Sequence, residues 1–120
     1  MNDNTIHIYD LTAIAGSIGL VRPAMLLLSY YIQAKSERNK IRIRKSDLCS
    51  IFDVSVNCVK KWITALCHAG AIKYHTDATV FVNPFLSYDG AEQDYADVVK
   101  EWHAFRSKIP AYKQPQSAAQ

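Results

Sequence analysis

Glycine is scarce in this chain, which contains four glycines among 120 residues. The sequence has no glycine-rich loop of the kind that cradles phosphates, no His-Glu metalloprotease pattern and no nucleophile motif. The four histidines are scattered along it, at positions 7, 68, 75 and 103. We therefore expect no catalytic constellation, no cofactor and no small-molecule substrate, and we predict that the protein is not an enzyme.

Cysteine is also sparse, and the three residues are an odd number that favours reduced thiols over a disulfide framework. Cys49, Cys58 and Cys67 follow one another at intervals of nine residues. Nine residues turn a helix by about 900°, so Cys58 and Cys67 face opposite sides of a common helix. Zinc needs several converging ligands, and we predict no metal site.

The beginning of the sequence lacks positive charge, because no lysine or arginine precedes Arg22. A secretory signal opens with basic residues, and this pattern is missing. The segment 11–32 is apolar, but Arg22 and Pro23 interrupt its middle, and two ordinary helices explain it better than a membrane span. Together with the reduced thiols, these features predict a cytoplasmic protein with no membrane partner.

The composition is that of an ordinary globular protein, with 49% hydrophobic and 21% charged side chains. Its length is typical of one domain, which we place at residues 1–109. A flexible tail is expected over 110–120, where Pro110 and Pro115 stand among small and polar residues.

The N-terminal third is predicted to be helical after a short lead-in. Residues 5–9 alternate isoleucine with polar residues, and a helix follows that ends near Gly16 or Gly19. Proline is tolerated in the first turn of a helix, so Pro23 is expected to open a second, buried helix over 24–35.

Residues 41–84 have the pattern of two short helices between a strand and a hairpin. The predicted elements are a strand over 41–44, a helix over 47–52 capped by Ser46, a helix over 56–69 capped by Ser55 and stopped by Gly70, and two hairpin strands over 72–74 and 80–82. The predicted fold is mainly α with a small β-hairpin.

The helix predicted over 56–69 has two unlike faces. At 100° per residue, Ile63 and Leu66 lie within about 40° of Val59 and Val56 lies near 60°, an apolar stripe that packs on the core. The opposite face is polar: it carries Asn57, Lys60, Lys61, Thr64 and His68, with Ser55 at the helix start. A major groove accepts a helix, in which asparagine pairs with adenine and lysine donates to guanine. We predict that this face reads double-stranded DNA; the alternative is the solvated face of any surface helix.

The net charge of +3 is unevenly distributed. Residues 35–75 contain nine basic and three acidic side chains, a net charge of +6, and the segments on either side are mildly acidic. Basic side chains around the first strand and on the hairpin are expected to hold the DNA backbone: Lys35, Arg38, Lys40, Arg42, Arg44, Lys45, Lys73 and His75. Alternatively, the charges near the strand are solvated and protect its edge from aggregation.

The run Ser-Val-Asn-Cys-Val-Lys-Lys-Trp-Ile from Ser55, followed by Leu66, Gly70 and Ile72, resembles the recognition helix of winged helix-turn-helix DNA-binding proteins. The resemblance implies a helix-turn-helix at about 46–70 and a wing at about 71–84. Cys58 stands where the family commonly has threonine and Lys60 where it has serine. The segment 80–84, followed by Gly90, is similar to the end of small plasmid replication proteins of the RepL type.

An extra C-terminal helix is predicted at about 91–108, where apolar residues recur at helical spacing. Two roles are open for it. The helix closes the domain's own core, or Val98, Trp102 and Phe105 form a dimer seam with the N-terminal helices. A homodimer is expected to read a pseudo-palindrome with half-sites about one helical turn apart.

The sequence therefore predicts sequence-specific binding of double-stranded DNA, in plasmid or mobile-element replication or in transcriptional regulation. The alternative is a winged-helix protein-interaction module in a replication or conjugation assembly, because a fold does not determine a function. In that case Trp62 and the helix of Trp102 are the interface anchors.

Overall fold

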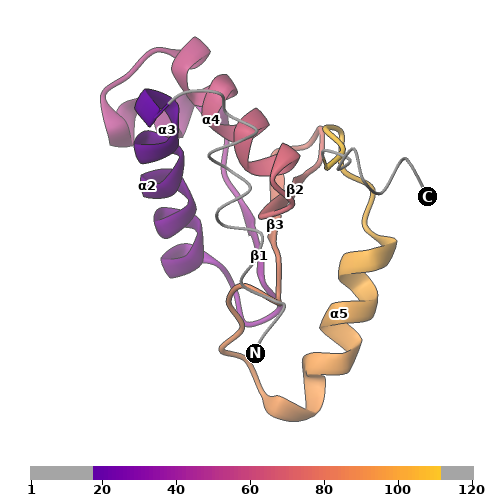
Figure 1. The fold of residues 1–120 in the computed structure, drawn as a ribbon. Helices are drawn as coiled ribbons and strands as arrows, with labels where there is room; N and C mark the ends of the chain where they lie inside the picture. The colour runs from indigo at the N-terminus through magenta and orange to yellow at the C-terminus, as the bar shows by residue number, and fades with distance from the viewer. Residues whose placement is uncertain (1–17, 112–120) are drawn as a thin grey trace, which may run out of the picture.

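The architecture is mixed α/β, with four α-helices and a three-stranded antiparallel sheet in the computed structural model, which describes residues 18–111 (Figure 1). The elements are α2 (Ile18–Ala34), β1 (Lys40–Arg42), α3 (Lys45–Phe52), α4 (Val56–His68), β2 (Ile72–Tyr74), β3 (Thr79–Val82), the 3-10 turn η2 (Glu92–Asp94) and α5 (Tyr95–Ala104). The sheet is larger than the predicted hairpin because β1 joins it. The lead-in at 5–9 and most of the predicted tail lie outside the described residues.

The sheet separates two groups of helices. Its strand order is β1-β3-β2, and Phe81 of β3 pairs with Lys40 on one side and Lys73 on the other. Side chains alternate along a strand, so Val80 and Val82 face the core formed with α2 and α4, whereas Phe81 belongs to a second cluster with α5. Accordingly, α2 and α5 lie on opposite sides of the sheet (Figure 1).

Helix α4 begins and ends where the sequence predicts. The Ser55 hydroxyl accepts a hydrogen bond from the backbone N–H of Cys58 at 3.3 Å, and Gly70 follows the helix with φ +78°. Val59, Ile63 and Leu66 are buried as expected. Val56 is not part of the buried stripe, since 44% of it is exposed in the first turn.

Two predicted helix starts are wrong. Helix α3 starts at Lys45 after an extended Arg44, so Ser46 lies inside its first turn and caps nothing. Helix α2 runs through Gly19 and Pro23, where a break was predicted. Pro23 is the sixth residue of the helix and removes one backbone hydrogen bond, and burial of Leu27 and Tyr31 stabilises the helix beyond it. No helix within residues 18–111 is long and apolar enough to span a membrane.

Helix α5 is shorter than the predicted helix over 91–108, because the chain leaves it to cover a sheet edge. Phe105 is extended, and residues 105–111 form a segment that we call the C-terminal strap. The backbone N–H of Tyr74 donates to the Ser107 hydroxyl at 3.1 Å, and the N–H of Lys108 donates to the Tyr74 carbonyl. An edge strand has unpaired backbone groups, and the strap satisfies those of Tyr74 in β2.

Asn39 holds the segment after β3 in place. It is buried, and its amide nitrogen donates to the carbonyls of Val82 at 3.0 Å and Ser87 at 2.7 Å. Its side-chain oxygen accepts from Lys35 Nζ at 3.1 Å. Asn39 also has φ +67°, a left-handed conformation that asparagine tolerates better than most residues. One side chain thus links two segments that are far apart in the sequence.

We expect Asn39→Ala to lower the free energy of unfolding by about 2–4 kcal/mol, because two carbonyls lose their donor and the buried Lys35 loses one of its two acceptors. Urea unfolding measures the loss. Asn57→Ala, an asparagine exposed on α4, is the matched control and should stay within about 0.5 kcal/mol of the parent protein. Equal unfolding midpoints for the two variants would contradict this role of Asn39.

Candidate nucleic-acid interface

The outer face of α4 carries the polar side chains that the sequence places there. Because the other side of α4 packs on α2, α3 and the sheet, this face is the one the helix presents to solvent. Four of its predicted members are exposed and two are half-buried. The exposed ones are Ser55, Asn57, Lys60 and Lys61, and the half-buried ones are Thr64 and His68.

A basic flank, which we define as Arg42, Arg44 and Lys45, runs from the end of β1 to the start of α3. Arg42 and Arg44 are exposed; Arg42 Nε donates to the Asp77 carbonyl at 3.0 Å, and Arg44 Nε lies 3.5 Å from an Asp47 carboxylate oxygen. Exposed ion pairs contribute little stability, so Arg44 can exchange its carboxylate for a phosphate at low cost.

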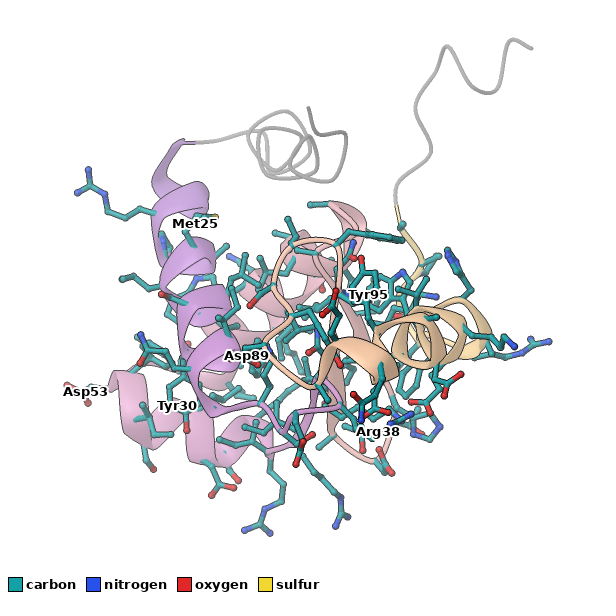
Figure 2. The ribbon with its side chains drawn as sticks, turned by 90° about the horizontal axis from the view of Figure 1, so that it is seen from below. Met25, Tyr30, Arg38, Asp53, Asp89 and Tyr95 are labelled. Atoms are coloured by element: carbon teal, nitrogen blue, oxygen red, sulfur yellow. The ribbon has the colours of Figure 1, made fainter. Side chains whose placement is uncertain are left out.

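Three of the basic side chains that are predicted to hold the DNA backbone form ion pairs with carboxylates of the same chain. The Lys35 side chain is only 1% exposed, with Nζ 2.9 Å from an Asp89 carboxylate oxygen. Arg38 and Lys40 both contact Glu101 of α5, and the bond from Arg38 holds the pKa of Glu101 below its usual range. Figure 2 shows Arg38 close to α5 and Asp89 between α2 and α5. Lys35 is buried in its ion pair and has little access to DNA. Contacts of Arg38 and Lys40 with DNA stay predictions, because 42% and 38% of their side chains are exposed.

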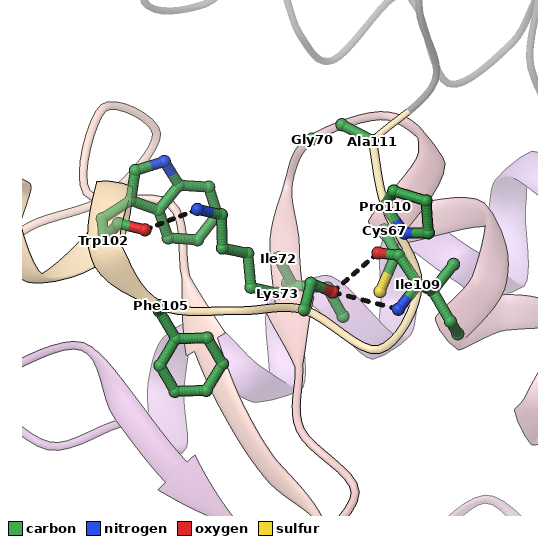
Figure 3. A pocket seen from close by; sticks show the side chains of 10 residues that line it. Cys67, Gly70, Ile72, Lys73, Trp102, Phe105, Ile109, Pro110 and Ala111 are labelled. Carbon is green, nitrogen blue, oxygen red and sulfur yellow. Dashed lines mark hydrogen bonds between the residues drawn. The ribbon is translucent and has the colours of Figure 1, made fainter.

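Lys73 is also engaged within the protein. Its Nζ lies 4.6 Å from the centre of the Trp102 ring and donates to the Trp102 carbonyl (Figure 3). Burial lowers the pKa of Lys73, because desolvation penalises the ammonium form. The alternation of β2 places Lys73 on the sheet face that α5 covers, where it packs on Trp102, and its contact with DNA stays a prediction.

The hairpin tip has a carboxylate beside its histidine. His75 is exposed, and its Nδ1 lies 3.0 Å from an Asp77 carboxylate oxygen. Hydrogen bonds from Thr79 lower the pKa of Asp77 to about 2, so this carboxylate is ionised at neutral pH. A negative group at the tip opposes entry into a groove, and a DNA contact by His75 stays a prediction.

The residues predicted for a dimer seam pack within the chain. Val98 and Trp102 are buried and Phe105 is half-buried. The rings of Trp102 and Phe105 each meet Phe81 edge to face, with centroids 5.4 Å apart. Helix α5 therefore completes the core of its own chain, and these three side chains offer a second copy little surface. Dimerisation itself stays a prediction.

The three cysteines differ in burial, since Cys67 is buried and Cys49 and Cys58 are half-buried. An apolar pocket of about 250 Å³ lies between the end of α4, β2 and the strap, and Cys67 is among its lining residues (Figure 3). Burial raises the pKa of the Cys67 thiol to about 12, so it is protonated and unreactive at neutral pH. Between residues 18 and 111, no three histidine, cysteine or acidic side chains gather as metal ligands.

Sequence reasoning missed two residues beside the α4 face, Tyr74 and Lys108. With Lys45, Lys60 and Thr64 they line a pocket of about 160 Å³. Lys108 was assigned to the C-terminal helix, where it would have no fixed relation to α4. Pro110 is too far along the chain to end the helix at Ala104, so the position of Lys108 depends on the contact of the strap with β2.

Comparison with known proteins adds no relative. No model of a protein family matches the chain. Neither a curated protein nor a solved structure matches it. The function is therefore inferred from the residues of the chain itself.

Proposed function

We propose that the chain is a winged-helix protein that binds double-stranded DNA sequence-specifically through α4. The observation that carries the proposal is the outer face of α4, a polar and basic helix face with the basic flank as a second source of cations. The succession of α3, a short turn, α4 and the β2–β3 hairpin supports the assignment as a helix-turn-helix followed by a wing.

The chemistry of the face suits a major groove. Helix α4 has 13 residues and is about 20 Å long at 1.5 Å per residue, and a groove about 12 Å wide accepts a helix. The Asn57 amide can pair with an adenine edge, and Lys60 and Lys61 can donate to guanine acceptors or phosphates. The basic flank would contact the backbone and set the orientation of the helix without reading sequence.

The protein-interaction alternative is less well supported, because its anchors are inaccessible. Trp62 is 9% and Trp102 is 7% exposed, and both indoles pack inside the chain. Binding hot spots need large aromatic side chains that a partner can reach. Occupying a DNA site requires no catalysis, and such occupancy suits plasmid or mobile-element replication as well as transcriptional regulation.

The test is a fluorescence-anisotropy titration of the full chain against a random duplex at 50 mM and 200 mM salt. With three to five phosphate contacts, we expect micromolar binding and a slope of log affinity against log salt of about −3 to −5. Absence of salt-sensitive binding at micromolar protein would overturn the proposal in favour of the interaction module. Selection from random duplexes then gives the site, and paired half-sites would identify a dimer.

A further inference from the structure

The pocket beside α4 gathers positive charge from three separate parts of the chain. Its volume is about 160 Å³, and it is lined by the lysines 45, 60 and 108, at the start of α3, on α4 and on the strap. The rest of the lining consists of Thr64, Tyr74 and two isoleucines, and among the described residues that form it none is acidic. Ligand sites for drug-sized molecules are about 300–1,000 Å³, so this pocket suits a single small group.

Tyr74 lines this pocket, and its hydroxyl hydrogen is available for a hydrogen bond to a ligand. The residue is 4% exposed, and its hydroxyl accepts from Lys45 Nζ at 2.9 Å. A phenol that accepts in this way keeps its own hydrogen for another acceptor. The Lys45 ammonium also lies 4.6 Å from the centre of the tyrosine ring, which holds it at the pocket.

The strap places Lys108 next to Tyr74. The backbone N–H of Lys108 donates to the Tyr74 carbonyl at 2.6 Å, and the N–H of Tyr74 donates to the Ser107 hydroxyl. These two bonds fix the strap on β2 from both sides of one residue. Lys108 therefore joins the α4 face only because the chain turns back after α5.

Three lysines that line one small pocket bring like charges together, and an anion bound among them lowers their mutual repulsion. A phosphate group supplies one or two negative charges and several acceptor oxygens, which match the ammonium and hydroxyl donors of the lining. We propose that this lysine pocket binds one phosphate group. Because Lys60 belongs both to the pocket and to the α4 face, the source we favour is a backbone phosphate of the bound duplex, and this part rests on the proposed function.

The experiment compares Lys108→Gln with Lys100→Gln, which removes the same charge from an exposed position on α5. In the first arm, duplex binding is titrated against salt. We expect Lys108→Gln to weaken affinity about five- to tenfold at 100 mM salt and to reduce the slope by close to one. Lys100→Gln should leave the slope unchanged, and Lys108→Arg should retain it.

The second arm uses inorganic phosphate and the backbone amide signals of Tyr74 and Lys108 in NMR spectra of the full chain. We expect phosphate to shift these signals in the parent protein and in Lys100→Gln, but not in Lys108→Gln. If phosphate shifts these signals as expected but Lys108→Gln keeps the salt slope of the parent protein, the pocket is supported and its ligand is free phosphate. The phosphate titration also tests the pocket if the chain does not bind DNA. If Lys108→Gln keeps both the salt slope and the phosphate-induced shifts of the parent protein, the proposal is overturned.

Discussion

We expect replacement of Lys60 and Lys61 together by alanine to weaken binding to duplex DNA about 30- to 100-fold at 100 mM salt and to reduce the salt slope by close to two. Both side chains are exposed on the outer face of α4. Each lysine that neutralises a phosphate releases about one counterion, so removing two such contacts changes affinity and slope together. Anisotropy titrations at four or more salt concentrations measure both quantities.

Two controls separate this effect from a general loss of positive charge. The double variant Lys100→Ala/Arg106→Ala removes two exposed cations from the C-terminal part of the chain and should leave the slope unchanged. Asn57→Ala should also keep the slope, but it should relax the preference at one base pair by about 1–3 kcal/mol if the amide pairs with adenine. An unchanged slope in Lys60→Ala/Lys61→Ala would refute the role of the two lysines.

Replacing Trp102 by alanine lowers the free energy of unfolding by about 3–5 kcal/mol. The indole covers Phe81 and lies beside the ammonium of Lys73, so its loss leaves a cavity where α5 meets the sheet. Domains of this size have a total stability of about 5–15 kcal/mol, and the variant therefore loses a large share of it.

Urea unfolding followed by circular dichroism measures this change, and the fluorescence of Trp62, the other tryptophan, reports on the main core. We expect the two signals to change together at a lower urea concentration than in the parent protein. Trp102→Phe is the control and should recover much of the stability, because it keeps an aromatic ring on Phe81. A midpoint equal to that of the parent protein would show that α5 contributes little to the core.

Features of the fold that depend on neighbouring residues were predictable from the sequence. The Ser55 cap, the stop at Gly70 and the hairpin need only local backbone chemistry, and the observed helix and strands agree closely with the prediction. The division of α4 into a buried and an exposed face follows from helical periodicity. Sequence reasoning therefore separated most of the buried from the exposed side chains of α4 correctly.

The distribution of basic side chains was not predictable in the same way. Lys35 and Lys73 are engaged with Asp89 and Trp102, which lie far along the chain and reach them only through tertiary packing. Lys108 was missed for the same reason, since its position depends on where the strap meets β2. The net charge of a sequence segment identifies a basic region. The partner of each cation in it depends on tertiary packing.

The pairing of Lys35 with Asp89 and of Arg38 and Lys40 with Glu101 has a consequence for biosynthesis. Their acidic partners are translated some fifty to sixty residues later than the cations. Until then, a nascent chain ending at the hairpin presents the whole basic region without these carboxylates. Such an incomplete chain is expected to adhere to ribosomal and messenger RNA indiscriminately, because non-specific binding to a polyanion increases with the number of available cations. Once the chain is complete through α5, all three cations have their carboxylate partners. In the proposed function, this leaves the outer face of α4 and the basic flank as the main sources of cations that meet DNA.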